Sequence, residues 1–277
     1  MRGYLAILRP PNLVMSFVGC LLGSAVVLGS VSTLLESLPL ALQAAAIAVL
    51  FTAAANTLND YYDRETDRVN HPERPIPSGQ VTARGALAVA GLLFAATVPW
   101  SLLLRWELLA VVLVNLAFMA SYETVFKRTG LRGNLLIAWL VASLFLFGGL
   151  ALYPDFPALL PVLVLALLAF LATLGREIVK DIEDVRGDTD RKTLPMRVGT
   201  AGAARVAAAS LVLAVGLSGL PPALQMLGLA YLPVVLVADA ILIYAALNSA
   251  RRPGLSQRAA KYGMMVALLA FLVGALP

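Results

Sequence analysis

Two groups of aspartates with the same spacing stand far apart in the chain, and both are candidates for binding a metal ion. In each group the second and third aspartates follow the first by three and seven positions, so all three fall on one face of a helix. Three like charges in a row repel one another, and a bound cation relieves that repulsion. Oxygen ligands favour Mg²⁺ over zinc or copper. The groups are Asp60, Asp63 and Asp67, and then Asp181, Asp184 and Asp188.

Neighbouring amide and carboxylate side chains enlarge this candidate site. Asn59 directly precedes the first group, and Asn56 and Glu177 extend the two rows by one helical turn. Two such clusters facing one another could hold Mg²⁺ around a diphosphate and neutralise it as a leaving group. We therefore expect Mg²⁺ as the cofactor. The expected metal ligands are Asn59, Asp60, Asp63, Asp67, Asp181, Asp184 and Asp188.

The rest of the chain is too apolar for a water-soluble protein. It has 277 residues, 60% of them hydrophobic and 13% charged, and its mean hydropathy is +0.85. An average soluble domain carries about 25% charged residues. A soluble enzyme, a disordered chain and a nucleic-acid-binding module are therefore excluded. The single cysteine, Cys20, can form neither an internal disulfide nor a zinc site. The composition indicates a polytopic membrane protein.

Apolar segments long enough to cross a membrane position the two motifs. A helix needs about 20 residues to cross a hydrocarbon layer ~30 Å thick, and the sequence contains nine such segments. We expect an all-α bundle of nine transmembrane helices around a central cavity, formed by one domain over residues 1–277. The expected spans are 12–32, 38–58, 84–104, 107–126, 133–153, 157–178, 201–220, 222–248 and 256–276.

The basic residues are sorted to one side of these nine segments. Of the 21 lysines and arginines, all but Arg105 fall near the N-terminus or in and beside the connections that follow even-numbered spans. By the positive-inside rule that side is cytoplasmic, so we expect a multi-pass protein of the cell membrane with its N-terminus inside and its C-terminus outside. Both aspartate groups also follow even-numbered spans, and both should lie at the cytoplasmic face.

Three kinds of protein could carry paired acidic motifs at that face. Solvated acidic loops would not need the same spacing twice. A transporter with one acidic site in each half of a repeat would hold its carboxylates near the bilayer midplane rather than at helix ends. A metal-dependent enzyme that acts on a phosphorylated lipid accounts for both the spacing and the position, and it is the preferred interpretation.

The motifs and the nine spans resemble those of the UbiA superfamily of intramembrane prenyltransferases over essentially the whole chain. The resemblance implies Mg²⁺-assisted departure of diphosphate from a prenyl diphosphate, which gives an allylic carbocation that an acceptor captures. It implies catalytic roles for four of the aspartates and a diphosphate-gripping role for a short element after the fourth span. These residues are Asp63, Asp67, Asp181 and Asp184 for catalysis, and Tyr122, Lys127 and Arg128 for the diphosphate.

The second motif and the following Lys192-Thr193-Leu194-Pro195 resemble the archaeal digeranylgeranylglyceryl phosphate synthases of that superfamily most. This implies geranylgeranyl diphosphate as the donor and geranylgeranylglyceryl phosphate as the acceptor. An aromatic acceptor such as 4-hydroxybenzoate is the alternative. Membrane lipids are the expected surroundings, and neither a nucleic acid nor an obligate protein partner is expected. Candidates for binding the acceptor are Asn56, Arg9, Arg74, Arg176 and Lys180.

Overall fold

The computed structural model describes residues 2–28, 35–152, 156–185 and 192–275, and every regular element in these ranges is a helix. The all-α prediction is therefore confirmed. The elements are α1 Arg2–Ile7, α2 Pro10–Leu28, α4 Leu38–Asn70, α5 Ala83–Leu104, α6 Trp106–Thr124, the 3-10 helix η1 Phe126–Arg128, α7 Leu131–Leu152, α8 Phe156–Asp184, α9 Leu194–Leu217, α10 Leu220–Ala223, α11 Tyr231–Asn248 and α12 Pro253–Gly274.

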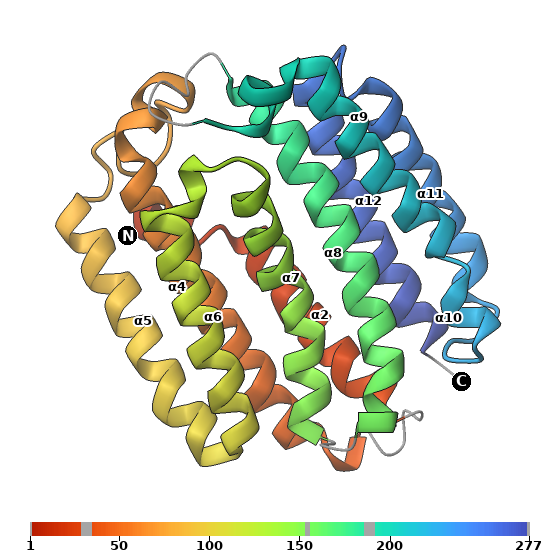
Figure 1. The fold of residues 1–277 in the computed structure, drawn as a ribbon. Coiled ribbons are helices and arrows are strands. Elements are labelled where there is room, and N and C mark those ends of the chain that lie inside the picture. Colours follow the sequence, from red (N-terminus) through yellow and green to blue (C-terminus); the bar gives the residue numbers. More distant parts are fainter. Residues whose placement is uncertain (1, 29–34, 153–155, 186–191, 276–277) are drawn as a thin grey trace.

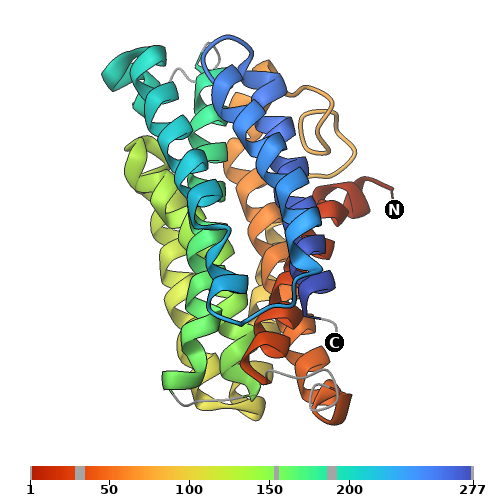
Figure 2. The ribbon, with the colours of Figure 1, turned by 90° about the vertical axis from the view of Figure 1, so that its right-hand side faces the viewer.

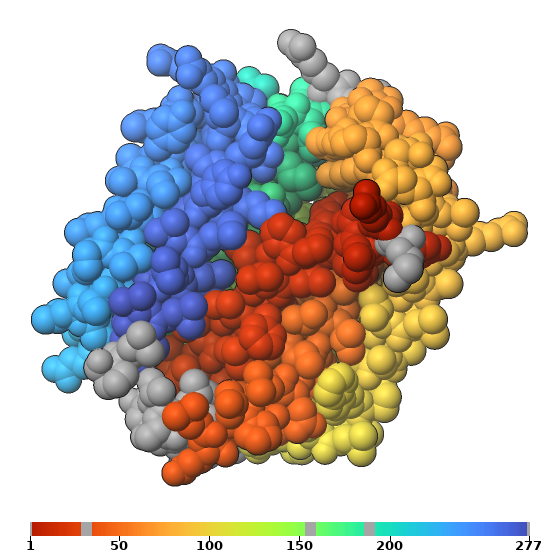
Figure 3. Space-filling view, turned by 180° about the vertical axis from the view of Figure 1, so that it is seen from behind, coloured from red at the N-terminus to blue at the C-terminus, as the bar shows by residue number. Residues whose placement is uncertain are grey.

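The long helices run side by side in one bundle (Figures 1 and 2). Helices that follow one another in the chain mostly pack together, as α4 does with α5, α7 with α8, and α11 with α12. Contacts between distant parts of the chain close the bundle, because α2 packs on α4, α7 and α8, and α12 packs on α8 and α2. Figure 3 shows α2 in red, lying between α12 in blue and the orange and yellow segments of α4 and α5.

Eight of the described helices are long and apolar enough to cross a membrane, namely α2, α4 to α9 and α11. The ninth expected span forms α12, which has 22 residues but carries Arg258 and Lys261 in its first half. Expected span 222–248 begins later than predicted, because α10 and a turn precede Tyr231. The chain is an integral multi-pass membrane protein. Within the described ranges eight helices qualify as spans by length and composition, and α12 is a further helix of the same bundle.

The two helices that carry the motifs are unusually long. α4 has 33 residues and α8 has 29, which correspond to about 50 Å and 43 Å of helix against a hydrocarbon layer of about 30 Å. Both helices are therefore longer than a single crossing requires, and the aspartates lie in their C-terminal parts. The first motif lies within α4 rather than in a loop, and α8 ends at Asp184.

Helices α2 and α7 approach each other closely through glycines. A methyl group on Gly23 would collide with the carbonyl oxygen of Phe145, and one on Gly148 would collide with that of Cys20. The Ser24 hydroxyl uses this closeness to donate a hydrogen bond to the Gly148 carbonyl at 2.9 Å. Small residues that let backbones meet are a common basis of helix packing in membranes.

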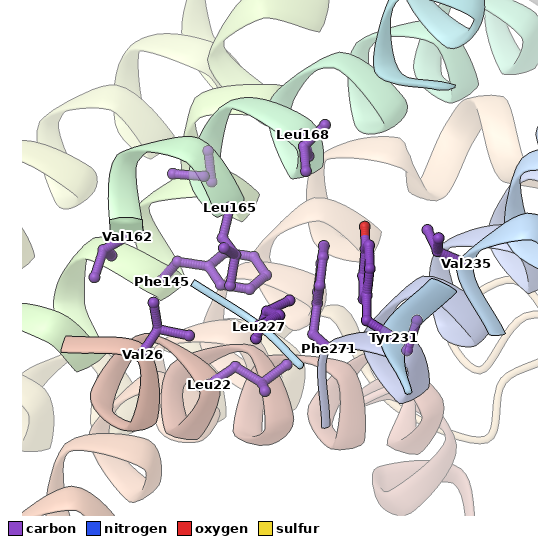
Figure 4. Close-up of a cluster of buried hydrophobic side chains, with 13 residues drawn as sticks. Leu22, Val26, Phe145, Val162, Leu165, Leu168, Leu227, Tyr231, Val235 and Phe271 are labelled. Carbon is purple, nitrogen blue, oxygen red and sulfur yellow. The ribbon is translucent and has the colours of Figure 1, made fainter. Parts of the chain in front are cut away.

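An apolar cluster joins α2, α7, α8, α11 and α12 in the halves of these helices away from the motifs. Figure 4 shows its side chains. Phe271 of α12 stacks on Tyr231 of α11 with ring centroids 5.6 Å apart, and the Tyr231 hydroxyl donates to the Ser218 carbonyl at 2.9 Å. Phe145 of α7 packs in the same cluster. These helices are thus joined at the closed end of the bundle by large side chains whose polar groups are satisfied.

Candidate active site

A cavity of about 640 Å³ runs through the bundle from a polar mouth to an apolar interior. Asn59 and Tyr122 line it near the first motif, and Asp184 lines it near the second. Phe145 and Phe271 line its deep end, where the apolar cluster begins. Its size is within the range of about 300–1,000 Å³ typical of ligand sites. One residue from each motif region, Asn59 and Asp184, therefore lines the same cavity, although the two are far apart in the sequence.

The three aspartates of the first motif are buried, although they are charged residues at the end of a helix. Asp60, Asp63 and Asp67 have exposed fractions of only 2%, 7% and 3%. Buried carboxylates need compensating charge, and each of these has at least one cation within ion-pair distance. Arg9 forms an ion pair with Asp60, Lys127 lies 2.9 Å from Asp63, and Arg74 lies 2.7 Å from Asp67.

The three cations come from three separate segments outside the spanning helices. Arg9 lies between α1 and α2 with a φ of 57°, a left-handed conformation that is uncommon for a residue with a side chain. Arg74 lies in the segment after α4, and Lys127 lies on η1. Burial lowers the pKa of Arg74, but the attraction and hydrogen bond of Asp67 outweigh it, so this pKa lies above its usual value. Ion pairs therefore hold these three segments against α4.

Lys127 occupies a pocket that includes a residue not predicted from the sequence. Its Nζ donates to Glu123 Oε2 at 2.6 Å and lies 5.4 Å from the centroid of the Tyr122 ring. The side chain of Glu123 has an exposed fraction of 0%, and its other oxygen accepts a hydrogen bond from Asn59 at 3.0 Å. Asn59 is thus oriented by Glu123. The only sequence signal was an acidic residue four positions before a lysine.

The second motif is held by residues from other helices. Asp181 Oδ2 accepts a hydrogen bond from the Asn134 amide of α7 at 3.0 Å. Asp184 Oδ1 lies 3.7 Å from His71 Nε2, a contact that becomes an ion pair when the histidine is protonated. Since His71 directly follows α4, it joins the ends of the two motif helices. Asp188 lies outside the described residues.

The structure separates the remaining predicted residues into two groups. Most of them line the cavity, whereas Arg128, next to the buried Lys127, is exposed and does not line it. The cavity lining also lacks Lys127, Asp60, Asp63, Asp67 and Asp181. The aspartates of the first motif pair with cations, and Asp181 accepts a hydrogen bond from Asn134. The predicted residues that line the cavity are Arg9, Asn56, Asn59, Arg74, Tyr122, Arg176, Lys180 and Asp184.

The ligand chemistry suits Mg²⁺, although the side chains do not form a closed metal site. In the described ranges, no three carboxylate, histidine or cysteine side chains converge closely enough to hold a metal ion together. The available oxygens come from aspartates and Asn59, which is the hard ligand set that Mg²⁺ prefers. Several of these oxygens now contact Arg9, Lys127 and Arg74. A metal that binds here must therefore share carboxylates with these cations or displace them.

Comparison with known proteins identifies the family of the chain. The UbiA prenyltransferase family matches residues 13–272. Digeranylgeranylglyceryl phosphate synthase of Natronomonas pharaonis is similar to the chain, with 41% identity over 282 residues that cover 99% of this chain and 97% of that protein. A solved structure of a digeranylgeranylglyceryl phosphate synthase in membranes has 31% identity and a TM-score of 0.74, and the match covers 99% of this chain and 98% of that one. A UbiA homolog from Archaeoglobus fulgidus, solved with GPP and Mg²⁺, has 18% identity and a TM-score of 0.64 and covers 96% and 99%. The chain belongs to the UbiA prenyltransferase family.

Proposed function

We propose that this protein transfers a geranylgeranyl group from geranylgeranyl diphosphate to the glycerol hydroxyl of geranylgeranylglyceryl phosphate, with Mg²⁺ as cofactor. The main support is the cavity, which has Asn59 of the first motif and Asp184 of the second at its polar end and an apolar interior. A prenyl diphosphate has the same division between a charged head and an apolar chain. Similarity to digeranylgeranylglyceryl phosphate synthases over nearly the full length supports the choice of donor and acceptor.

The donor diphosphate is proposed to lie between the two motifs. Asn59, Asp60, Asp63 and Asp67 on one side, and Asp181, Asp184 and Asp188 on the other, would hold the metal. Bound Mg²⁺ would neutralise charge on the diphosphate oxygens as the carbon–oxygen bond of the donor breaks.

Lys127 is proposed to bind the diphosphate directly. It already lies at Asp63 and Glu123, so it can pass from these carboxylates to a phosphate oxygen by a change of side-chain conformation. Arg74 and Arg9 pair with aspartates of the same motif and can change partners in the same way. Tyr122, under the Lys127 amine, keeps this amine in place by a cation–π contact.

The transfer itself needs little assistance from the acceptor side. When the donor carbon–oxygen bond breaks, the electron pair leaves with the diphosphate and an allylic carbocation remains. The glycerol hydroxyl oxygen attacks this carbon, forms the ether bond and loses its proton. A carboxylate that faces the cavity can accept the proton, and Asp184 is one such group. The apolar cavity wall keeps water away from the carbocation.

The protein is further proposed to act as a single domain in the cell membrane, with its N-terminus and both motifs on the cytoplasmic side and its C-terminus outside. The distribution of the basic residues supports this orientation, since Arg105 alone lies at the opposite end, between α5 and α6. Soluble, charged prenyl diphosphates would then reach the mouth from the cytoplasm.

A competition experiment tests the proposed acceptor. Purified protein receives geranylgeranyl diphosphate, Mg²⁺ and equal amounts of geranylgeranylglyceryl phosphate and 4-hydroxybenzoate, and the products are identified by mass spectrometry. We expect the diether phosphate as the main product. Prenylated 4-hydroxybenzoate as the sole product would refute the proposed acceptor and leave the metal chemistry intact.

A further inference from the structure

A second group of polar side chains lines the cavity on the wall formed by α2, α8 and α12. Its members are Asn12, Arg176, Gln257 and Lys261. Lys261 Nζ donates to Asn12 Oδ1 at 3.0 Å, and Arg176 Nη2 donates to Gln257 Oε1 at 3.4 Å. These contacts join three helices that are distant in the sequence. On the face shown in Figure 3, α2 and α12 lie next to each other.

The charges in this group are only partly compensated. Arg176 Nη1 lies 2.5 Å from Glu177 Oε1, but Glu177 is shared with Lys180, whose Nζ lies 3.5 Å from its other oxygen. The Nε of Arg176 is buried and has no hydrogen-bond partner within the described ranges. In that part of the chain no carboxylate lies within ion-pair distance of Lys261, whose partner is the neutral Asn12. The wall therefore has donors available for an anion.

This group differs from the cations at the first motif. Arg9, Lys127 and Arg74 each face an aspartate of α4, and so they belong to the proposed donor site. Lys261 and Arg176 come from α12 and α8 and contact amide groups, and Arg176 also pairs with Glu177. The proposed reaction involves two anionic heads, a diphosphate and a phosphate monoester, which need separate binding groups.

The position of Lys261 also suits a lipid. Met264, Leu268 and Phe271 follow it on the same face of α12, and all of them line the cavity. Residues three, seven and ten positions after a lysine form a continuous stripe along a helix. A charged head held at Lys261 would therefore have an apolar track below it, leading toward the stacked Phe271 and Tyr231 (Figure 4).

The group lies close enough to the donor site for a short molecule to connect them. Asn12 Nδ2 donates to Asn56 Oδ1 at 3.4 Å, and Asn56 is one helical turn before Asn59 and Asp60 on α4. The hydroxyl groups of a glycerol phosphate are only a few bonds from the phosphorus. A phosphate held by Lys261 would thus leave the hydroxyl near the first motif, where the donor carbon is expected.

We propose that Lys261 and Arg176, with Asn12 and Gln257, bind the phosphate of the acceptor lipid and thereby select a phosphorylated acceptor. This inference rests on the proposed function. Two cations match the charge of a phosphate monoester, which is about −1.5 to −2 at neutral pH. Lys261 is therefore a residue that determines acceptor specificity, and it had been interpreted from the sequence only as part of the cytoplasmic charge excess.

The test compares the variant Lys261→Gln with two acceptors, geranylgeranylglyceryl phosphate and the same lipid without phosphate. With the phosphorylated acceptor we expect kcat/KM to fall roughly ten- to hundredfold, as when one charge-assisted hydrogen bond is lost. With the unphosphorylated acceptor we expect a change below about threefold, because that lipid has no charge for the lysine to bind. The KM for the donor should stay as in the unmodified protein, and Lys261→Arg should restore most of the loss.

Arg258→Gln is the matched control, because it removes one positive charge from an exposed position on the same helix. It should leave kcat/KM for both acceptors and the KM for the donor unchanged. Each variant is checked for the same elution profile and thermal unfolding midpoint as the unmodified protein. Equal losses with both acceptors would show a structural role for Lys261, and a changed donor KM would place it in the donor site. Either result would overturn the proposal.

Failure of the proposed function has a different signature. If the unmodified protein transfers no prenyl group to either acceptor, binding of geranylgeranylglyceryl phosphate is measured in nanodiscs without donor or Mg²⁺. Binding that requires the phosphate and weakens at least tenfold in Lys261→Gln would still support the subsite. Binding that is the same with and without the phosphate would refute it.

Discussion

Replacement of Lys127 by methionine tests whether the first motif is neutralised by its own cations. The Lys127 side chain has an exposed fraction of 6%, and its amine contacts Asp63 at 2.9 Å and Glu123 at 2.6 Å. Methionine keeps a similar length without the charge. The variant therefore leaves two buried carboxylates next to each other, and in place of the amine there is a thioether that cannot donate a hydrogen bond.

The expected cost follows from this burial. Removing one partner of a buried ion pair typically destabilises a protein by about 3–5 kcal/mol, because the other charge is left uncompensated. Lys127→Met should lose stability in this range when no metal is present. Adding Mg²⁺ should restore more stability to the variant than to the unmodified protein, since a divalent cation can compensate the same oxygens. Adding Glu123→Gln to the Lys127→Met variant should recover part of the lost stability, because only one uncompensated buried carboxylate, that of Asp63, then remains.

The assay is denaturant unfolding of the detergent-solubilised protein, with and without Mg²⁺. Arg128→Gln is the control, because this neighbouring arginine is exposed, and it should change the free energy of unfolding by less than about 0.5 kcal/mol. Lys127→Met with unchanged stability would contradict the ion-pair arrangement. In activity assays the same variant should mainly raise the KM for the donor, since the diphosphate is charged both before and during the reaction.

Three further predictions concern metal-dependent catalysis, the proximity of the two motif helices, and helix packing. Asp63→Ala and Asp184→Ala should each lower kcat by about 10²–10³-fold, and excess EDTA should abolish turnover of the unmodified protein. A near-normal rate in any of these assays would exclude the proposed role of the metal. Cysteines introduced by His71→Cys and Asp184→Cys, in a Cys20→Ala background, should be joined by a short thiol crosslinker, because His71 Nε2 and Asp184 Oδ1 lie 3.7 Å apart. No crosslinking, while a more distant pair of cysteines reacts, would refute the proximity of the two motif helices. Gly148→Ala should lower the free energy of unfolding by about 1–3 kcal/mol or more, because the added methyl group collides with the Cys20 carbonyl. Gly91→Ala is the control and should be tolerated, because open space surrounds this position. Equal stability of the two variants in thermal unfolding would contradict the close approach of α2 and α7.

Regular spacing within one helix was the part of the site that could be predicted from the sequence. The positions of Asp60, Asp63 and Asp67 indicated one helical face, and in the structure all three are buried on α4. Helix periodicity depends only on the local backbone and needs no knowledge of neighbours. The same holds for the all-α architecture, since apolar segments of membrane-spanning length fold in lipid as helices or closed barrels.

Contacts between helices could not be predicted in this way. Glu123, Asn134 and His71 each contact a motif residue, but they do so from α6, α7 and the segment after α4. Nothing in their local sequence specifies which helix will lie opposite. Lys127 and Arg128 show the same limit on a smaller scale, because adjacent residues on a short 3-10 helix point in different directions, one buried and one exposed.

The boundaries of the last helices depend on a feature that hydropathy does not detect. Residues 222–248 are apolar enough to be taken for one span, but two prolines lie in α10, and the chain turns before Tyr231. α12 carries polar side chains in its first half, and two of them, Gln257 and Lys261, line the cavity instead of facing lipid. Polar residues that line the cavity therefore contribute to the lower hydropathy of α12.

Release of diphosphate from geranylgeranyl diphosphate by the purified protein, in the presence and absence of geranylgeranylglyceryl phosphate and Mg²⁺, tests the central claim most directly. The two motifs at one cavity predict rapid release only when the donor, the acceptor and Mg²⁺ are all present, with one ether bond formed for each diphosphate released. Release that continues in excess EDTA would contradict this account, as would transport of the donor across vesicles without any release.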